Sequence, residues 1–188
     1  MLKRILTAAA MAAAALTVQP AFSNRVEEFS TTLSGFNEVG GLGAGETGAV
    51  MSEGTGHLKL VLDRSTQSIR YTLTFSGLSS PVLQSHIHFG KVHVAGGVMV
   101  FFCSNLATAP AGVQPCPAGG GTITGTIMAN NVLALPGQNV TAGDFDAITD
   151  ALESETAYAN VHTQNFPAGE IRGDIARDGR EGRDHDRD

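Results

Sequence analysis

The sequence predicts an all-β sandwich or barrel with one short helix. Two observations lead to this fold class: apolar and polar residues alternate along about seven short runs, and glycine, at 23 of 188 residues, is abundant around them. The alternation is clearest from Ile69 to Phe75, where every second side chain is apolar, as in an antiparallel strand with one buried face. The other predicted strands cover 29–33, 58–62, 98–102, 122–127, 157–163 and 170–176.

The N-terminal residues 1–23 predict a secretory signal peptide. Lys3 and Arg4 form a basic start, an apolar run follows over 5–18, and Ala21-Phe22-Ser23 fits a small-x-small cleavage site. This apolar run is shorter than the roughly 18–20 residues that a bilayer span needs, and no later run is longer. We therefore expect no membrane span, and a mature protein that is secreted or periplasmic.

The charge of the chain excludes one class of partner. Loss of Lys3 and Arg4 with the signal lowers the Lys and Arg count from 12 to 10 against 18 acids, so the net charge moves from −6 to −8. Such a surface repels phosphate backbones, and the sequence predicts no nucleic-acid partner.

The mature chain divides into one domain and a tail. Residues 24–176 are enough for a single domain with one core. From 177 to 188 the residues are charged or glycine, and none is apolar. Because such a segment buries no surface to offset its ordering entropy, we expect residues 177–188 to be disordered.

One segment departs from the strand pattern. Phe145, Ile148 and Leu152 recur at helical spacing, and Thr141 to Asp144 resembles a capping box. The pattern predicts one amphipathic helix over 142–154 that covers the sandwich with its apolar side.

The two cysteines predict a disulfide. Cys103 and Cys116 are separated by a loop that contains proline and glycine, and export places them in an oxidising compartment. A Cys103–Cys116 bridge would close this short loop.

Three histidines form a candidate metal site. His86 and His88 are two residues apart, so a strand would place both on one face with Cα atoms about 6.5–7 Å apart. His162 lies in a second predicted strand, and two strands can bring three imidazoles together. Three neutral imidazoles suit copper or zinc. The alternative is a packed polar patch in which the histidines only donate hydrogen bonds; His93 is a weaker candidate for a fourth ligand.

Glu170 and Arg172 are expected next to this site. They share one face of the last predicted strand, where they can pair in a salt bridge, or Glu170 can orient His162. A turn at 165–169 would place Arg172 on the strand beside His162.

Three motifs carry a family resemblance. Ser85-His86-Ile87-His88, Asn160-Val161-His162-Thr163 and Gly169-Glu170-Ile171-Arg172-Gly173, together with Leu33-Ser34-Gly35-Phe36-Asn37-Glu38, follow one another in the order and spacing of the chordin (CHRD) domain family. The chain resembles this family over residues 28–176, which implies an extracytoplasmic module.

The family has been suspected of a distant relation to copper-zinc superoxide dismutase. That relation implies a Greek-key β-sandwich of the immunoglobulin-like or superoxide-dismutase-like type. It also implies copper ligands at His86, His88 and His162, a bridging role for His93, and a substrate-guiding role for Arg172.

These observations favour an exported binding module that recognises an extracytoplasmic protein or small ligand, and whose histidines either bind copper or zinc or only stiffen the fold. No nucleophile motif or phosphate loop occurs, so no catalytic residue is assigned. Two alternatives stay open: a copper-dependent redox enzyme of superoxide-dismutase type, and a structural protein of the cell envelope.

Overall fold

The computed structural model describes residues 26–39 and 48–179. The predicted signal peptide and residues 180–188 of the predicted tail lie outside the described residues. The described chain holds nine strands and one α-helix, which with three short 3-10 helices follow in the order β1 (Val26–Ser34), η1 (Gly35–Asn37), β2 (Thr55–Asp63), β3 (Ser68–Ser76), β4 (Val82–Phe89), β5 (Gly97–Ser104), β6 (Gly121–Ile127), η2 (Ala129–Asn131), η3 (Pro136–Gln138), α1 (Phe145–Glu153), β7 (Ala157–Thr163), β8 (Ile171–Asp174) and β9 (Ala176–Arg177).

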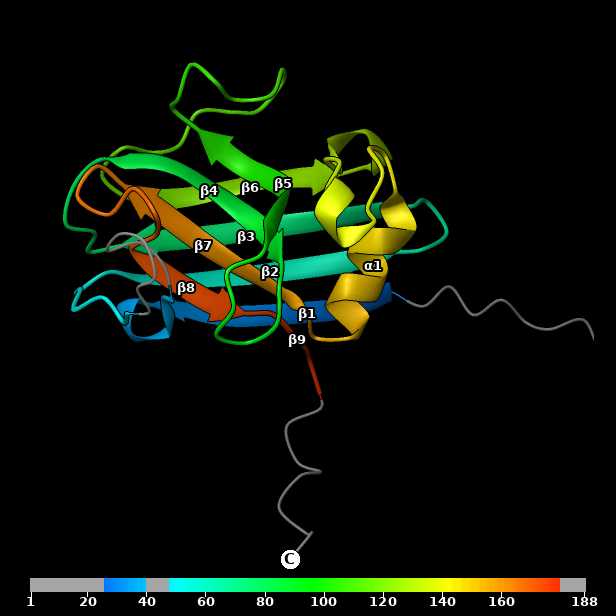
Figure 1. Ribbon diagram of the computed structural model, residues 1–188, viewed down its shortest axis with the longest axis horizontal. Coiled ribbons are helices and arrows are strands. Elements are labelled where there is room, and N and C mark those ends of the chain that lie inside the picture. Colours follow the sequence, from blue (N-terminus) through cyan, green and yellow to red (C-terminus); the bar gives the residue numbers. More distant parts are fainter. Residues whose placement is uncertain (1–25, 40–47, 180–188) are drawn as a thin grey trace, which may run out of the picture.

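All strands belong to one antiparallel sheet. Its order is β5-β4-β7-β8-β1-β2-β3-β6, and β9 pairs with β1. The sheet curls so that β4, β7 and β8 cross over β1, β2 and β3, and the result is a nearly closed barrel (Figure 1). The predicted all-β fold with one short helix is confirmed; the two layers expected of a sandwich are two halves of one continuous sheet.

The chain order of the strands is what brings the site together. β7 pairs with β4 rather than with β6, the strand that precedes it in the chain, which is the return connection of a Greek key. As a result, β4 and β7 lie side by side although some seventy residues separate them, with His86 opposite Asn160 and His88 opposite Tyr158.

The barrel interior is built from the inward side chains of the strands. In β3, buried and exposed residues alternate along the whole strand, as its sequence pattern predicts. β7 is different, because every one of its residues is buried. Its inner face joins the core through Ala157, Ala159 and Val161, so its outer face must be covered by other parts of the chain.

The helix is shorter than predicted. We expected it over 142–154 with a capping box from Thr141, but α1 covers Phe145–Glu153 and Asp144 is its N-cap, accepting a hydrogen bond from the Ala147 N–H. Gly143, at φ +82°, forms the turn before the cap and cannot continue the helix backward. Ile148 and Leu152 are fully buried, as the spacing predicts. No helix in the described chain has the length and apolar character needed to cross a membrane.

The beginning of the predicted tail is ordered, which corrects the expectation that disorder starts at 177. Arg177 belongs to β9 and forms ion pairs with Glu27 and, at 3.3 Å, with Glu153 of α1. The main-chain N–H of Asp178 donates to the main-chain carbonyl oxygen of Glu28. Paired charges and main-chain hydrogen bonds hold this segment, and a pattern of apolar residues does not reveal such contacts.

The predicted disulfide is present. Cys103, at the end of β5, is bonded to Cys116, thirteen residues later and shortly before β6. The bridge therefore closes the connection between β5 and β6, the two end strands of the sheet.

Reduction of this disulfide is expected to lower the free energy of unfolding by about 3 kcal/mol, because the bridge restricts the unfolded chain over a loop of this length. Urea unfolding of the oxidised protein, the reduced protein and the Cys103→Ser/Cys116→Ser variant measures the difference. Equal unfolding midpoints in all three would contradict the expectation.

Candidate metal centre

The three histidines lie together on the outer face of β4 and β7. His86 and His88 come from β4, and His162 comes from β7, where it follows Tyr158 and Asn160 on the same face. The pairing of β4 with β5 is irregular at Ser85/His86 and at Ile87/His88. Such bulges re-aim side chains. Here they occur at both histidines of the pair.

The geometry fits one shared ion. One nitrogen from each of His86, His88 and His162 lies within 4.8 Å of the other two. The rings of His86 and His162 are 4.8 Å apart between centroids, and those of His86 and His88 are 5.3 Å apart. All three side chains are buried, with exposed fractions of 1, 7 and 6 % for His86, His88 and His162. No other described group of histidines, cysteines and acids forms such a cluster.

Main-chain carbonyls fix the orientation of two rings. Nδ1 of His88 lies 2.9 Å from the Gly96 carbonyl oxygen, and Nδ1 of His162 lies 2.9 Å from that of Pro167. A carbonyl only accepts, so both Nδ1 atoms carry the proton and both Nε2 atoms are left with a lone pair. Nε2 of His88 lies 3.1 Å from Oδ1 of Asn160, which is also an acceptor, so with Nδ1 protonated this pair forms a hydrogen bond only when the Asn160 amide turns its NH2 group toward the ring. Nε2 of His162 has no hydrogen-bond partner among the described residues.

His86 is the least satisfied of the three. Neither of its ring nitrogens has a hydrogen-bond partner in the described chain. Its ring packs edge-on against Phe101 of β5, at 4.4 Å between centroids. Leaving a buried polar group unpaired costs about 1–3 kcal/mol, so this arrangement is unfavourable unless a ligand engages the ring.

Burial keeps all three histidines neutral. It lowers the pKa of His86 to about 2, with further lowering by His162 and His88, while the Asn160 side chain raises it only in part. Burial also lowers the pKa of His162 to about 4 and lowers that of His88. Neutral imidazoles are the form that binds metal, so at neutral pH no proton has to be displaced.

These shifts predict a pH dependence for the metal-free protein. A histidine whose pKa is lower in the folded state is protonated more readily when unfolded, so stability is complete above about 6.5 and is lost as the pH falls. Between pH 6.5 and 5, His86 and His162 should each cost about 2 kcal/mol, at about 1.4 kcal/mol per pH unit. Urea unfolding at pH 7 and pH 5 tests this, and His162→Ala should reduce the slope. A pH-independent midpoint would contradict it.

A loop over the site links it to β8. The connection between β4 and β5 lies across β7 and β8 (Figure 1). Arg172 of β8 holds this loop, because its guanidinium donates to the carbonyls of Val94, at 3.2 Å, and Lys91, at 3.3 Å. The N–H of Gly96 donates to the hydroxyl of Tyr158. The carbonyl of Gly96 then orients His88.

Arg172, Tyr158 and His88 form a stack. The guanidinium carbon of Arg172 lies 3.4 Å from the centre of the Tyr158 ring, and the His88 ring lies parallel to Tyr158 at 4.6 Å. Arg172 is fully buried. Its acidic partner is Asp174, at 3.2 Å. The expected proximity of Arg172 to the histidines therefore holds through Tyr158, not through direct contact.

The expected salt bridge between Glu170 and Arg172 is wrong, and Glu170 does not orient His162. Glu170 is fully buried and accepts hydrogen bonds from Ser52, from Thr163, and from both the main chain and side chain of Ser79. Burial raises its pKa, but these donors outweigh burial and lower it overall. Glu170 precedes β8 and connects the loops that contain Ser52 and Ser79 to the end of β7 at Thr163.

His93 does not join the cluster. It lies exposed in the loop between β4 and β5, with a positive φ of 60°. Gly96 was not among the predicted site residues, although the pair Gly96-Gly97 could have indicated a close backbone approach. A Cβ at Gly96 would lie 1.8 Å from the Phe89 carbonyl oxygen, so only glycine fits there.

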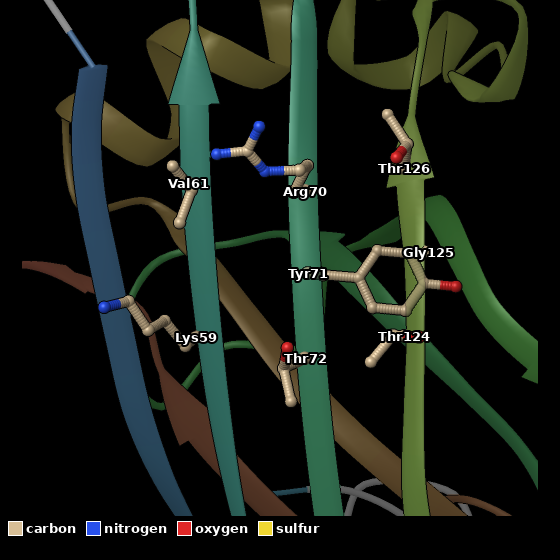
Figure 2. A pocket seen from close by; sticks show the side chains of 8 residues that line it. All are labelled: Lys59, Val61, Arg70, Tyr71, Thr72, Thr124, Gly125 and Thr126. Atoms are coloured by element: carbon tan, nitrogen blue, oxygen red, sulfur yellow. The ribbon is translucent and has the colours of Figure 1, made fainter.

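A second hollow lies on the outer face of another part of the barrel, formed by β2, β3 and β6. Figure 2 shows its lining on β2, β3 and β6, where the ring of Tyr71 lies over Gly125. The lining side chains are neither histidines nor acids: Lys59, Val61, Arg70, Tyr71, Thr72, Thr124, Gly125 and Thr126. This hollow therefore offers no donor set of the kind that the histidine cluster has.

Comparison with known proteins gives one match. A family model described as the CHRD domain matches residues 29–175. No curated protein and no solved structure matches the chain. The expected likeness to copper-zinc superoxide dismutase is thus supported by no match.

Proposed function

The chain belongs to the CHRD domain family, and on this premise we propose that it is an exported binding module that holds one copper or zinc ion. His86, His88 and His162 are the proposed ligands. One observation carries the proposal: one ring nitrogen from each of the three histidines lies within 4.8 Å of the other two, and His86 and His162 hold buried nitrogens that have no hydrogen-bond partner among the described residues.

The donor set fits such an ion. Metal–imidazole distances of about 2.0–2.1 Å place the nitrogens of one ion about 3.3–3.6 Å apart, so the rings need to approach by about 1 Å. The carbonyls of Gly96 and Pro167 supply the outer contacts that orient metal-binding histidines, since each accepts from Nδ1. At His88, only the Asn160 side chain has to move away from Nε2 before this nitrogen can bind the ion.

The proposed location is outside the cytoplasm, as a secreted or periplasmic protein. The disulfide supports this, because such bridges persist in oxidising compartments. The N-terminal signal pattern points the same way. The proposed partner of the module is an extracytoplasmic protein or a small ligand.

Metal analysis of the exported protein tests the proposal. The mature chain, with His185 of the tail replaced by alanine, is purified without metal-affinity steps and dialysed against Zn(II), against Cu(II) or, without oxygen, against Cu(I). One ion per chain that survives dialysis is the expected result. No retained copper or zinc would overturn the proposal and leave the histidines as a packed polar patch.

A further inference from the structure

We propose that this site selects Cu(I) over divalent ions, and that the buried positive charge of Arg172 sets the selection. The inference rests on the metal binding proposed above, and deepens it by naming the ion. Three features of the described residues support it: the charge of the donor set, the number of donors, and the position of Arg172.

The donor set brings no negative charge. All three members of the cluster are histidines, and no carboxylate or thiolate of the described chain belongs to it. The ion therefore keeps its full charge in a buried position. Because the cost of burying a charge rises steeply with its size, a monovalent ion is favoured over a divalent one.

The number of donors points in the same direction. Zinc takes four ligands, and a three-histidine site must complete that set with water or an anion. Cu(I) is stable with two or three nitrogen donors. At exposed fractions of 1–7 %, the three rings leave little access for water, which suits the ion that needs no fourth ligand.

The positive charge of Arg172 disfavours a highly charged ion at the site. It is fully buried and stacks on Tyr158, which in turn stacks on His88, so its charge lies two rings away in a water-poor region. Two carboxylates also act on Tyr158: Glu38, which is buried, and Asp174, which is partly exposed, at 30 % of its side chain.

The test compares Cu(I), under anaerobic conditions, with Zn(II) by competition against chelators of known affinity. In Arg172→Gln, the ratio of Zn(II) to Cu(I) affinity should rise by about tenfold, because a divalent ion gains twice as much from loss of the charge. Arg172→Lys keeps the charge and should keep the wild-type ratio. Asp174→Asn leaves Arg172 less compensated and should lower the ratio.

The outcomes separate the two proposals. An equal loss of both affinities in Arg172→Gln and Arg172→Lys, together with an unchanged ratio in Asp174→Asn, would overturn the charge role and leave Arg172 as a support for the loop. Tighter binding of Zn(II) than of Cu(I) by the wild type would overturn the selectivity alone. Binding of neither ion by the wild type would overturn the metal site itself.

Discussion

Replacement of His162 by alanine is expected to abolish stoichiometric metal binding. His162 is the one ligand from β7, and its Nε2 is buried, deprotonated and without a partner in the described chain. Loss of an outer contact to a metal ligand already costs 10–100-fold in affinity, so loss of the ligand should cost at least about 100-fold. Isothermal titration of the metal-free variant with Zn(II) and competition with a Cu(I) chelator measure the change.

His57 and His93 provide matched controls. Both are exposed and lie outside the cluster, so His57→Ala and His93→Ala should bind metal as the wild type does. The fold of His162→Ala is checked by its urea midpoint at pH 7, where only a small change is expected. Unchanged affinity in folded His162→Ala, or a comparable loss in either control, would contradict the assignment.

Substitution of Gly96 by alanine is expected to damage both stability and the site. Its Cβ would meet the main chain of Phe89, at 1.8 Å from the oxygen and 2.4 Å from the carbon, and a backbone contact cannot turn away as a side chain can. We expect a loss of about 1–3 kcal/mol in the free energy of unfolding. As the loop shifts, His88 loses the Gly96 carbonyl, and metal affinity should fall 10–100-fold.

Gly137→Ala is the control for this substitution. A Cβ at Gly137 meets nothing within 4 Å, so this variant should match the wild type in urea midpoint and in metal affinity. Gly96→Ala with wild-type affinity would show that the loop does not orient His88, whatever its effect on stability.

Much of the fold could be predicted from the sequence. Alternation in β3 reports directly on one buried face, and the apolar spacing of α1 reports on one buried side. The start of α1 was predicted too early because Thr141 and Asp144 both look like caps, and only the turn at Gly143 decides between them. The order at Arg177 depends on Glu27 and Glu153, which are distant in sequence and invisible to a local pattern.

Part of the site could likewise be predicted from the sequence, and part of it could not. His86 and His88 could be predicted to share a face because a strand has a period of two. That His162 meets them depends on β7 pairing with β4, a long-range choice that the spacing within each motif does not contain. The partners of Glu170 could not be predicted, since Ser52 and Ser79 lie in loops whose positions depend on the closed barrel.

The most direct test of the central claim is the X-ray absorption spectrum, at the copper edge, of the exported protein loaded with one equivalent of Cu(I). If His86, His88 and His162 hold the ion, the spectrum shows about three nitrogen neighbours at about 2.0 Å with the outer scattering of imidazole rings. A first shell of sulfur or of non-imidazole oxygen, or a failure to retain copper, would contradict the three-histidine site.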